Sequence, residues 1–129
     1  MLLSCVIVDD SAEFLEASRS LLEREGLPVV GVAANARDAL ERIDELRPQV
    51  ALVDIYLGCD SGFDVARRIA KDAPTTVILI STRAEDDFAE LIAASPAAGF
   101  ISKSELSAHA IQRLVNGQSG NGASATPGR

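Results

Sequence analysis

The chain has 129 residues, of which 47% are hydrophobic, and its 19 acidic and 12 basic residues give a net charge of −7. This length is enough for one domain with a stable core, and the hydrophobic fraction excludes wholesale disorder. The acidic balance opposes direct binding to nucleic acid, which relies on basic patches. The sequence has neither an apolar run near the ~18 residues of a membrane span nor a signal peptide, so we expect a cytoplasmic protein without membrane contact.

Apolar runs alternate five times with amphipathic stretches along the chain. The runs are rich in Val, Ile and Leu, which predicts strands buried on both faces, and the stretches between them have the apolar spacing of helices. In chain order the predicted elements are a strand over 2–8, a helix over 12–25, a strand over 29–34, a helix over 36–46, a strand over 50–53, a helix capped by Ser61 in a capping box with Asp64 and reaching Lys71, a strand over 76–80, a helix over 85–94, a strand over 99–102 and a helix capped by Ser104 that ends near Val115. This alternation predicts a parallel sheet with helices on both faces, a doubly wound α/β fold in three layers.

The C-terminal segment, the two cysteines and the single histidine complete this outline of the chain. Residues 117–129 are Gly, Ser, Asn, Ala, Thr, Pro, Gln and Arg without an apolar pattern, which predicts a flexible tail or the start of a linker after a domain over residues 1–116. The two cysteines make neither a disulfide framework nor a metal cluster, so we expect Cys5 in the core and Cys59 in a loop. His109 is expected on the surface of the last helix.

Polar side chains follow four of the predicted strands. Asp9 and Asp10 come after the first strand, Asp54 after the third, Ser81 after the fourth and Lys103 after the fifth. Each alone would usually be a turn, cap or loop residue, but ligands of an open α/β sheet bind beyond the carboxyl ends of its strands. Three carboxylates at one edge repel unless a cation lies among them, and oxygen ligands select Mg²⁺. A nearby lysine adds the positive charge that a phosphoryl group requires.

This set of residues resembles the signature of response-regulator receiver domains of bacterial two-component signalling. The neighbouring residues agree with it: Asp54-Ile55-Tyr56-Leu57 with Gly62 eight residues after Asp54, Ser81-Thr82-Arg83-Ala84, and Ala98-Gly99-Phe100-Ile101-Ser102-Lys103. The resemblance covers about residues 3–116, and residues 97–104 are most similar to the LuxR-type, NarL-like subgroup. It implies a flavodoxin-like (βα)₅ fold with a parallel five-stranded sheet in the order 2-1-3-4-5.

The resemblance also implies the chemistry of the site. Asp54 would be the nucleophile that takes a phosphoryl group from a phosphohistidine of a sensor histidine kinase, so the domain would catalyse only its own phosphorylation and dephosphorylation. Lys103 and Ser81 would each contact a phosphoryl oxygen. For Mg²⁺, the implied ligands are Asp10 and Asp54 directly, Asp9 through water, and the backbone carbonyl of Tyr56.

A conformational switch follows from the same resemblance. Ser81 would move towards the phosphate, and Phe100 would turn inward to fill the space behind it. This movement would displace the predicted fourth helix and fifth strand, within a responding surface over residues 85–115. The alternative for Phe100 is an ordinary core aromatic beside a helix.

Two residues depart from the pattern of many relatives, which have proline at both positions. Gly58 makes the loop after Asp54 freer. Ser104 follows Lys103 and predicts a trans peptide bond there, because a cis bond before a non-proline residue costs about 3 kcal/mol. Tyr56 and Arg83 each lie two residues beyond a site residue, and we expect them to overhang the site and to tune the lifetime of the phosphate.

Three other classes of protein are less consistent with the sequence. An aspartate-nucleophile phosphatase of the haloacid-dehalogenase type has an acid two residues after its nucleophile, where this chain has Tyr56 after Asp54 and Ala12 after Asp10. A flavodoxin-like cofactor carrier has a loop rich in Ser, Thr and Gly after its first strand, where acidic residues would repel a phosphate. A degenerate receiver that only docks to partners is disfavoured by the intact set of site residues.

The output stays open at this point. In the LuxR-type subgroup a polar linker leads into a helix-turn-helix domain that regulates transcription, so the chain represents either the receiver of such a regulator or a single-domain regulator that acts on a target protein. The resemblance also allows a homodimer that forms on phosphorylation. The segment itself is not expected to bind nucleic acid.

Overall fold

The computed structural model describes residues 3–123, and their side chains as far as Gly117. Its main sheet has five parallel strands: β1 (Cys5–Val8), β2 (Val29–Ala33), β3 (Val50–Asp54), β6 (Thr76–Ser81) and β7 (Gly99–Ser102). They lie in the order β2-β1-β3-β6-β7. Numbered by their succession within this sheet, the order is 2-1-3-4-5, as predicted.

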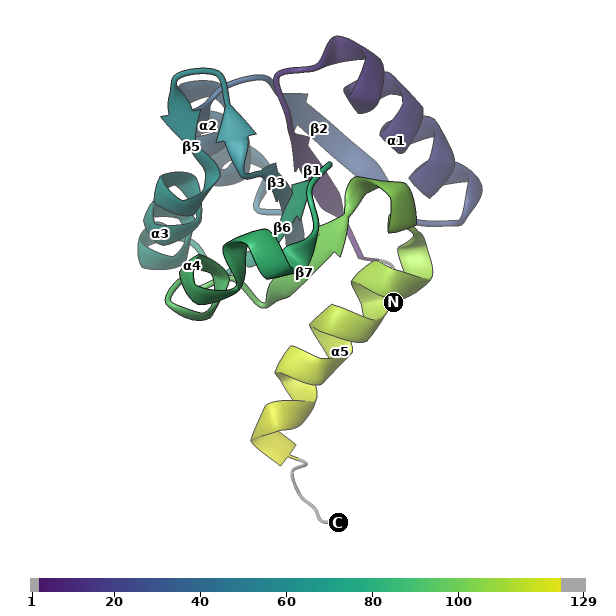
Figure 1. Cartoon of the computed structure of the whole chain (residues 1–129). Coiled ribbons are helices and arrows are strands. Elements are labelled where there is room, and N and C mark those ends of the chain that lie inside the picture. Colours follow the sequence, from purple (N-terminus) through teal and green to yellow (C-terminus); the bar gives the residue numbers. More distant parts are fainter. Residues whose placement is uncertain (1–2, 124–129) are drawn as a thin grey trace.

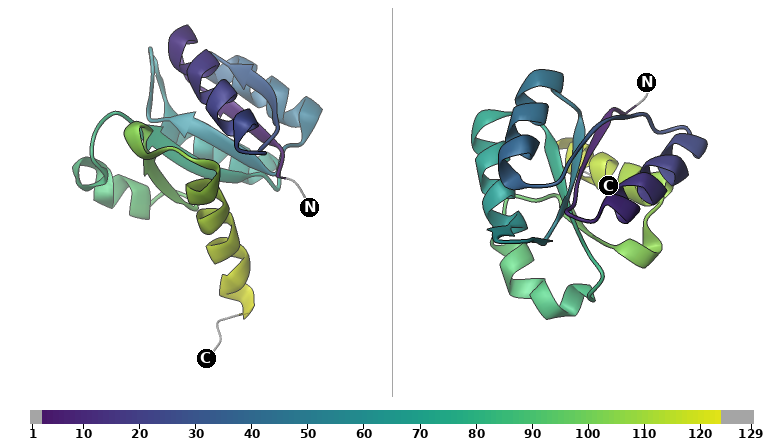
Figure 2. Two further views of the ribbon diagram at one scale, coloured as in Figure 1. Left: turned by 90° about the vertical axis from the view of Figure 1, so that its right-hand side faces the viewer. Right: turned by 90° about the horizontal axis from the view of Figure 1, so that it is seen from above.

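Helices cover both faces of the sheet (Figures 1 and 2). On one face lie α1 (Ala12–Arg24) and α5 (Ala108–Ala123); on the other lie α2 (Ala36–Leu46), α3 (Gly62–Asp72) and the short α4 (Ala89–Ala93). The predicted three-layer, doubly wound α/β fold is therefore confirmed. None of the helices in the described part of the chain has the length and apolarity that a membrane crossing demands.

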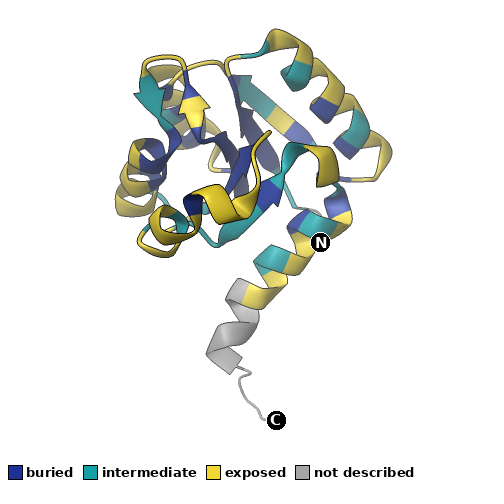
Figure 3. Cartoon of the chain, viewed as in Figure 1, coloured by how far each residue is buried: buried dark blue, intermediate teal, exposed yellow. Residues whose placement is uncertain are grey.

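The core is divided between the two faces by the alternation of the strand side chains. In β1, Val6 and Val8 pack with the α2 and α3 residues, whereas Cys5 and Ile7 pack with the α1 and α5 residues. All four side chains are fully buried, and Figure 3 shows the buried strands between helices whose outer faces are exposed. Both faces thus require apolar residues, which explains the continuous runs in the sequence.

Side chains of the preceding residues cap the first three helices, as the sequence predicts for Ser61. Ser11 Oγ accepts a hydrogen bond from the backbone N–H of Phe14, and Ser61 Oγ accepts one from that of Phe63. The predicted capping box at Ser61 does not form, because the carboxylate of Asp64 pairs with Arg67 in the next turn.

The predicted fourth helix differs from the observed structure. Residues 85–94 form a 3₁₀ turn, η1 (Glu85–Phe88), followed by the five-residue helix α4. The break lies at Phe88, whose backbone leaves the helical region (φ −127°, ψ 14°). Its ring is buried against the cluster under α2 and α3, so burial of this aromatic overrides a continuous helix.

The start of the last helix was also predicted wrongly. Ser104 belongs to a short 3₁₀ turn, η2 (Lys103–Glu105), and α5 begins at Ala108. Two side chains satisfy its first backbone N–H groups: Ser107 Oγ accepts from Ala110 N at 3.0 Å, and Glu25 Oε1 accepts from Ala108 N at 2.7 Å. Glu25 lies at the end of α1, so sequence spacing alone could not indicate this cap.

The end of the same helix lies further along the chain than expected. The apolar pattern stops near Val115, yet α5 continues to Ala123 because backbone hydrogen bonds can extend a helix past its buried face. The expected division into a domain over 1–116 and a tail over 117–129 stays a prediction, and residues 124–129 lie outside the described residues.

A small hairpin after β3 was not predicted. β4 (Tyr56–Leu57) and β5 (Asp60–Ser61) pair antiparallel across the turn at Gly58 and Cys59. Gly58 has a φ of +66°, a left-handed conformation that the ring of proline excludes. This turn accounts for the glycine at position 58.

Candidate functional site

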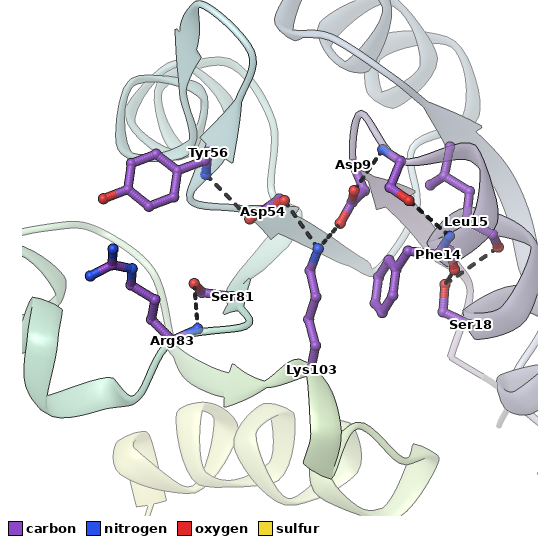
Figure 4. A network of polar contacts seen from close by, with 10 residues as sticks. Asp9, Phe14, Leu15, Ser18, Asp54, Tyr56, Ser81, Arg83 and Lys103 are labelled. Atoms are coloured by element: carbon purple, nitrogen blue, oxygen red, sulfur yellow. Dashed lines mark hydrogen bonds and ion pairs between the residues drawn. The ribbon is translucent and has the colours of Figure 1, made fainter.

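The carboxyl ends of β1, β3 and β7 bring Asp9, Asp54 and Lys103 into direct contact (Figure 4). Lys103 Nζ lies 2.6 Å from Asp9 Oδ2 and 3.2 Å from Asp54 Oδ2. Asp9 is fully buried, Asp54 is 7% exposed, and Lys103 is half-buried. One ammonium group is thus shared by two buried carboxylates that are 45 residues apart in the chain (54 − 9).

The other oxygen of Asp54 is held by the backbone of the hairpin that follows it. Asp54 Oδ1 accepts a hydrogen bond of 3.2 Å from the N–H of Tyr56. Gly62, the first residue of α3, donates its N–H to Ile55 O at 2.8 Å. A Cβ at Gly62 would lie 2.2 Å from the carbonyl oxygen of Asp54, so only glycine lets α3 begin against this strand end.

The charges around Asp54 shift two pKa values. Burial first, and then the nearby charge of Asp9, raise the pKa of Asp54, although Lys103 and the N–H of Tyr56 oppose this change. Burial would lower the pKa of Lys103, but its hydrogen bonds and ion pairs with Asp9 and Asp54 outweigh burial, and the pKa is raised. Lys103 is therefore positively charged. The acids around it carry more negative charge than this one ammonium group can balance.

The acidic residues have the donor set of a site for a hard divalent cation. Asp9, Asp10 and Asp54 each place one carboxylate oxygen within 4.8 Å of the others. Asp9 Oδ2 is buried and forms the 2.6 Å ion pair with Lys103, and a carboxylate oxygen with one such partner keeps a lone pair for a further one. Carboxylate oxygens so placed fit Mg²⁺. The part assigned to the carbonyl of Tyr56 stays a prediction.

The two residues of the predicted switch lie on neighbouring strands. Ser81 is buried at the end of β6, and its Oγ accepts a hydrogen bond of 3.0 Å from the N–H of Arg83. In the register of β6 and β7, Ser81 is opposite Ser102, whereas the half-buried Phe100 is opposite Leu79. Phe100 therefore lies two residues before the end of β7, on the strand next to Ser81.

Tyr56 and Arg83 are both exposed, and their side chains extend on the same side of Asp54 (Figure 4). Their expected effect on the lifetime of the phosphate stays a prediction. The ring of Tyr56 also contacts that of Phe88 edge-on, with centroids 5.9 Å apart. The Lys103–Ser104 peptide bond is trans, as predicted.

Sequence reasoning missed one neighbour of the site. The ring of Phe14 in α1 lies 4.3 Å from Lys103 Nζ, measured to the ring centroid. The helical spacing indicated only that Phe14 is an apolar residue of the buried face. Nothing in the pattern indicated that the lysine after β7 would cross to this ring.

The chain belongs to the response regulator receiver domain family, whose model matches residues 5–115. Two protein-glutamate methylesterases/protein-glutamine glutaminases are similar to it: one from Alkalilimnicola ehrlichii is 37% identical over 80% of this chain and 27% of its own length, and one from Myxococcus xanthus is 38% identical over 74% and 28%. The chain spans about a quarter of the length of these curated relatives.

Solved receiver domains are similar in structure as well. The receiver domain of NarL from Mycobacterium tuberculosis has a TM-score of 0.80 and 31% identity, covering 90% of this chain and 98% of that one. A LuxR-family response regulator from Aurantimonas sp. has a TM-score of 0.81 and 25% identity, covering 91% and 87%. Family membership therefore decides against the phosphatase and the cofactor carrier, and the LuxR-type and NarL-like resemblance is confirmed.

Proposed function

We propose that Asp54 accepts a phosphoryl group from a phosphohistidine of a sensor histidine kinase, and that the domain has no enzymatic activity beyond its own phosphorylation and dephosphorylation. One observation carries the assignment. The Asp54 carboxylate is held between the N–H of Tyr56 and the ammonium group of Lys103, at the strand end where the other acidic residues gather.

The residues at this strand end suit phosphoryl transfer. An oxygen of Asp54 attacks phosphorus, the P–N bond to the imidazole breaks, and its electron pair returns to the histidine nitrogen, which takes up a proton. Lys103 already contacts Asp54 and places a positive charge where the phosphoryl oxygens would arrive.

We assign Mg²⁺ to the acidic residues, with Asp10 and Asp54 as direct ligands, Asp9 through water and Tyr56 through its backbone carbonyl. The spacing of the three carboxylates and the capacity of Asp9 Oδ2 support this assignment. When bound, the cation neutralises negative charge on the transferred phosphoryl oxygens.

We extend the proposal to a conformational switch formed by Ser81 and Phe100, and their placement supports it. If Ser81 Oγ turned to a phosphoryl oxygen, it would lose its hydrogen bond with the N–H of Arg83. Arg83 lies in the short segment that connects β6 to η1, so the change would be transmitted to η1. Phe100 is half-buried, so an inward turn of its ring would bury surface that is now exposed. The change would reach the surface formed by α4, β7 and α5 as a shift between two packings.

The output favoured by the NarL-like and LuxR-family similarity is transcription, through a DNA-binding domain joined to the receiver. The alternative is a target protein contacted by a single-domain regulator. In either case the partners are a sensor histidine kinase and an output domain or target, and a homodimer that forms on phosphorylation belongs to the same proposal. The cytoplasmic location expected from the sequence stays a prediction.

The acceptor is tested with a small phosphodonor. Incubation with acetyl phosphate and Mg²⁺ should add one phosphate to the parent protein by intact-mass spectrometry, and Asp54→Asn should abolish the addition. Asp72→Asn, at the far end of α3, is the matched control and should be phosphorylated like the parent. Equal incorporation by Asp54→Asn would refute the assignment.

A further inference from the structure

Among the described residues, the ammonium group of Lys103 lies close to two acids and to one aromatic ring. Its Nζ contacts Asp9 and Asp54, and the ring of Phe14 stands beside it at 4.3 Å (Figure 4). A lysine within about 6 Å of an aromatic ring centroid is attracted to the negative face of the ring. The attraction is stronger where water is excluded, and the Lys103 side chain is only 14% exposed.

Phe14 is held in place by the same acid that pairs with Lys103. Asp9 Oδ1 accepts a hydrogen bond of 2.8 Å from the N–H of Ser11. Ser11 Oγ then accepts one of 3.2 Å from the N–H of Phe14, which caps α1. The contacts therefore form a closed ring through Asp9, Ser11, Phe14 and Lys103. This ring fixes the position of the start of α1 relative to the site.

We propose that Phe14 is a positioning residue for phosphoryl transfer, whose ring keeps the ammonium group of Lys103 between Asp9 and Asp54. This inference rests on the proposed role of Asp54 as phosphoryl acceptor. An aromatic face suits the task because it attracts the ammonium without adding a full negative charge. A third carboxylate at this place would hold Lys103 more tightly and would repel the arriving phosphoryl group.

A purely structural role for Phe14 makes a different prediction. Phe14 is half-buried and packs with the α1 and α5 cluster, so it also contributes to the core. Leucine at this position would fill much of the same space and contact the methylene groups of Lys103, but would not attract its ammonium. Phe14→Leu and Phe14→Tyr therefore separate attraction by the ring from packing alone.

The experiment measures the phosphorylation rate with acetyl phosphate at saturating Mg²⁺. Phe14→Leu should slow phosphorylation by about three- to tenfold, the size of a partly desolvated cation–π contact, and Phe14→Tyr should restore most of the rate. Leu15→Ala is the matched control, because Leu15 is a half-buried neighbour in the same helix and cluster. It should lower stability without slowing phosphorylation.

A double-mutant cycle shows whether Phe14 acts through the lysine. In a Lys103→Met background, Phe14→Leu should cause no further loss of rate. A loss as large as in the parent background, or an unchanged rate in Phe14→Leu, would overturn the proposal.

A measurement on the unphosphorylated protein keeps the two hypotheses distinguishable. The Cε protons of Lys103 should be shifted upfield by the ring of Phe14 in the NMR spectrum, and this shift should vanish in Phe14→Leu. Absence of the shift in the parent protein contradicts the positioning role even if Phe14→Leu does not fold. A parent protein that shows the shift but accepts no phosphate on Asp54 contradicts the proposed function instead.

Discussion

Gly62 is the residue at which the structure makes its sharpest quantitative prediction. A Cβ there would lie 2.2 Å from Asp54 O and 2.8 Å from Ile55 Cα, both of them backbone atoms that cannot rotate away. Overpacking of this kind costs about 3 kcal/mol, the upper end of the usual range. Replacing glycine by alanine regains about 1 kcal/mol through helix propensity and the unfolded chain. Gly62→Ala should therefore destabilise the domain by about 2 kcal/mol and lower Tm by roughly 8 °C.

The assay is urea unfolding followed by circular dichroism, together with phosphorylation by acetyl phosphate. Because the obstacle is the backbone of Asp54, the proposed acceptor, the substitution should slow phosphorylation as well as lower stability. Gly117→Ala is the control, since Gly117 is also helical and a Cβ there meets nothing within 4 Å. It should leave stability unchanged or raised. A Gly62→Ala protein as stable as the parent would show that α3 does not need its close approach to Asp54.

Three further predictions concern the metal, the switch and the thiols. Asp10→Ala should weaken Mg²⁺ binding in titrations far more than Asp72→Ala, an exposed acid distant from the site; equal affinities would make Asp10 an ordinary turn residue. Ser81→Ala should leave the domain phosphorylatable but reduce the amide-exchange response of η1 and α4 to beryllofluoride with Mg²⁺, and a full response would contradict the switch. Burial raises the pKa of the Cys5 thiol to about 12, so at pH 8 a thiol reagent should label Cys59 alone in the native protein. Labelling of native Cys59→Ser would refute this.

Much of the fold could be predicted from the sequence because each layer leaves its own periodic pattern. A strand covered on both faces has a continuous apolar run, and β3 is buried at every position from Val50 to Asp54. The order of elements along the chain then limits the topology, since parallel strands need a crossover between them. The same reasoning placed the site, because a charged residue that ends a buried run must emerge at the carboxyl edge of the sheet.

The errors have a different origin, since each depends on contacts between elements distant in the chain. The fourth helix was expected to be continuous, but the burial of Phe88 against α3 interrupts it after one turn. The last helix was expected to begin at Ser104, but its first N–H group is satisfied by Glu25 from another helix. The sequence pattern indicates which local structure each residue prefers. It does not indicate which residues distant in the chain will contact that residue and change its local structure.

The same limit applies within the site, where sequence order identifies the charged groups but not the balance among them. The buried carboxylates of Asp9 and Asp54 share one ammonium group, the exposed Asp10 lies near both, and burial together with Asp9 raises the pKa of Asp54. This arrangement is unfavourable by itself, and the apolar core beneath it offsets that cost. The negative charge of the three acids therefore exceeds the single positive charge of Lys103, which Asp9 and Asp54 share. On the proposed function, a cation or a phosphoryl group would redistribute the contacts that now hold Asp9, Asp54 and Lys103 together.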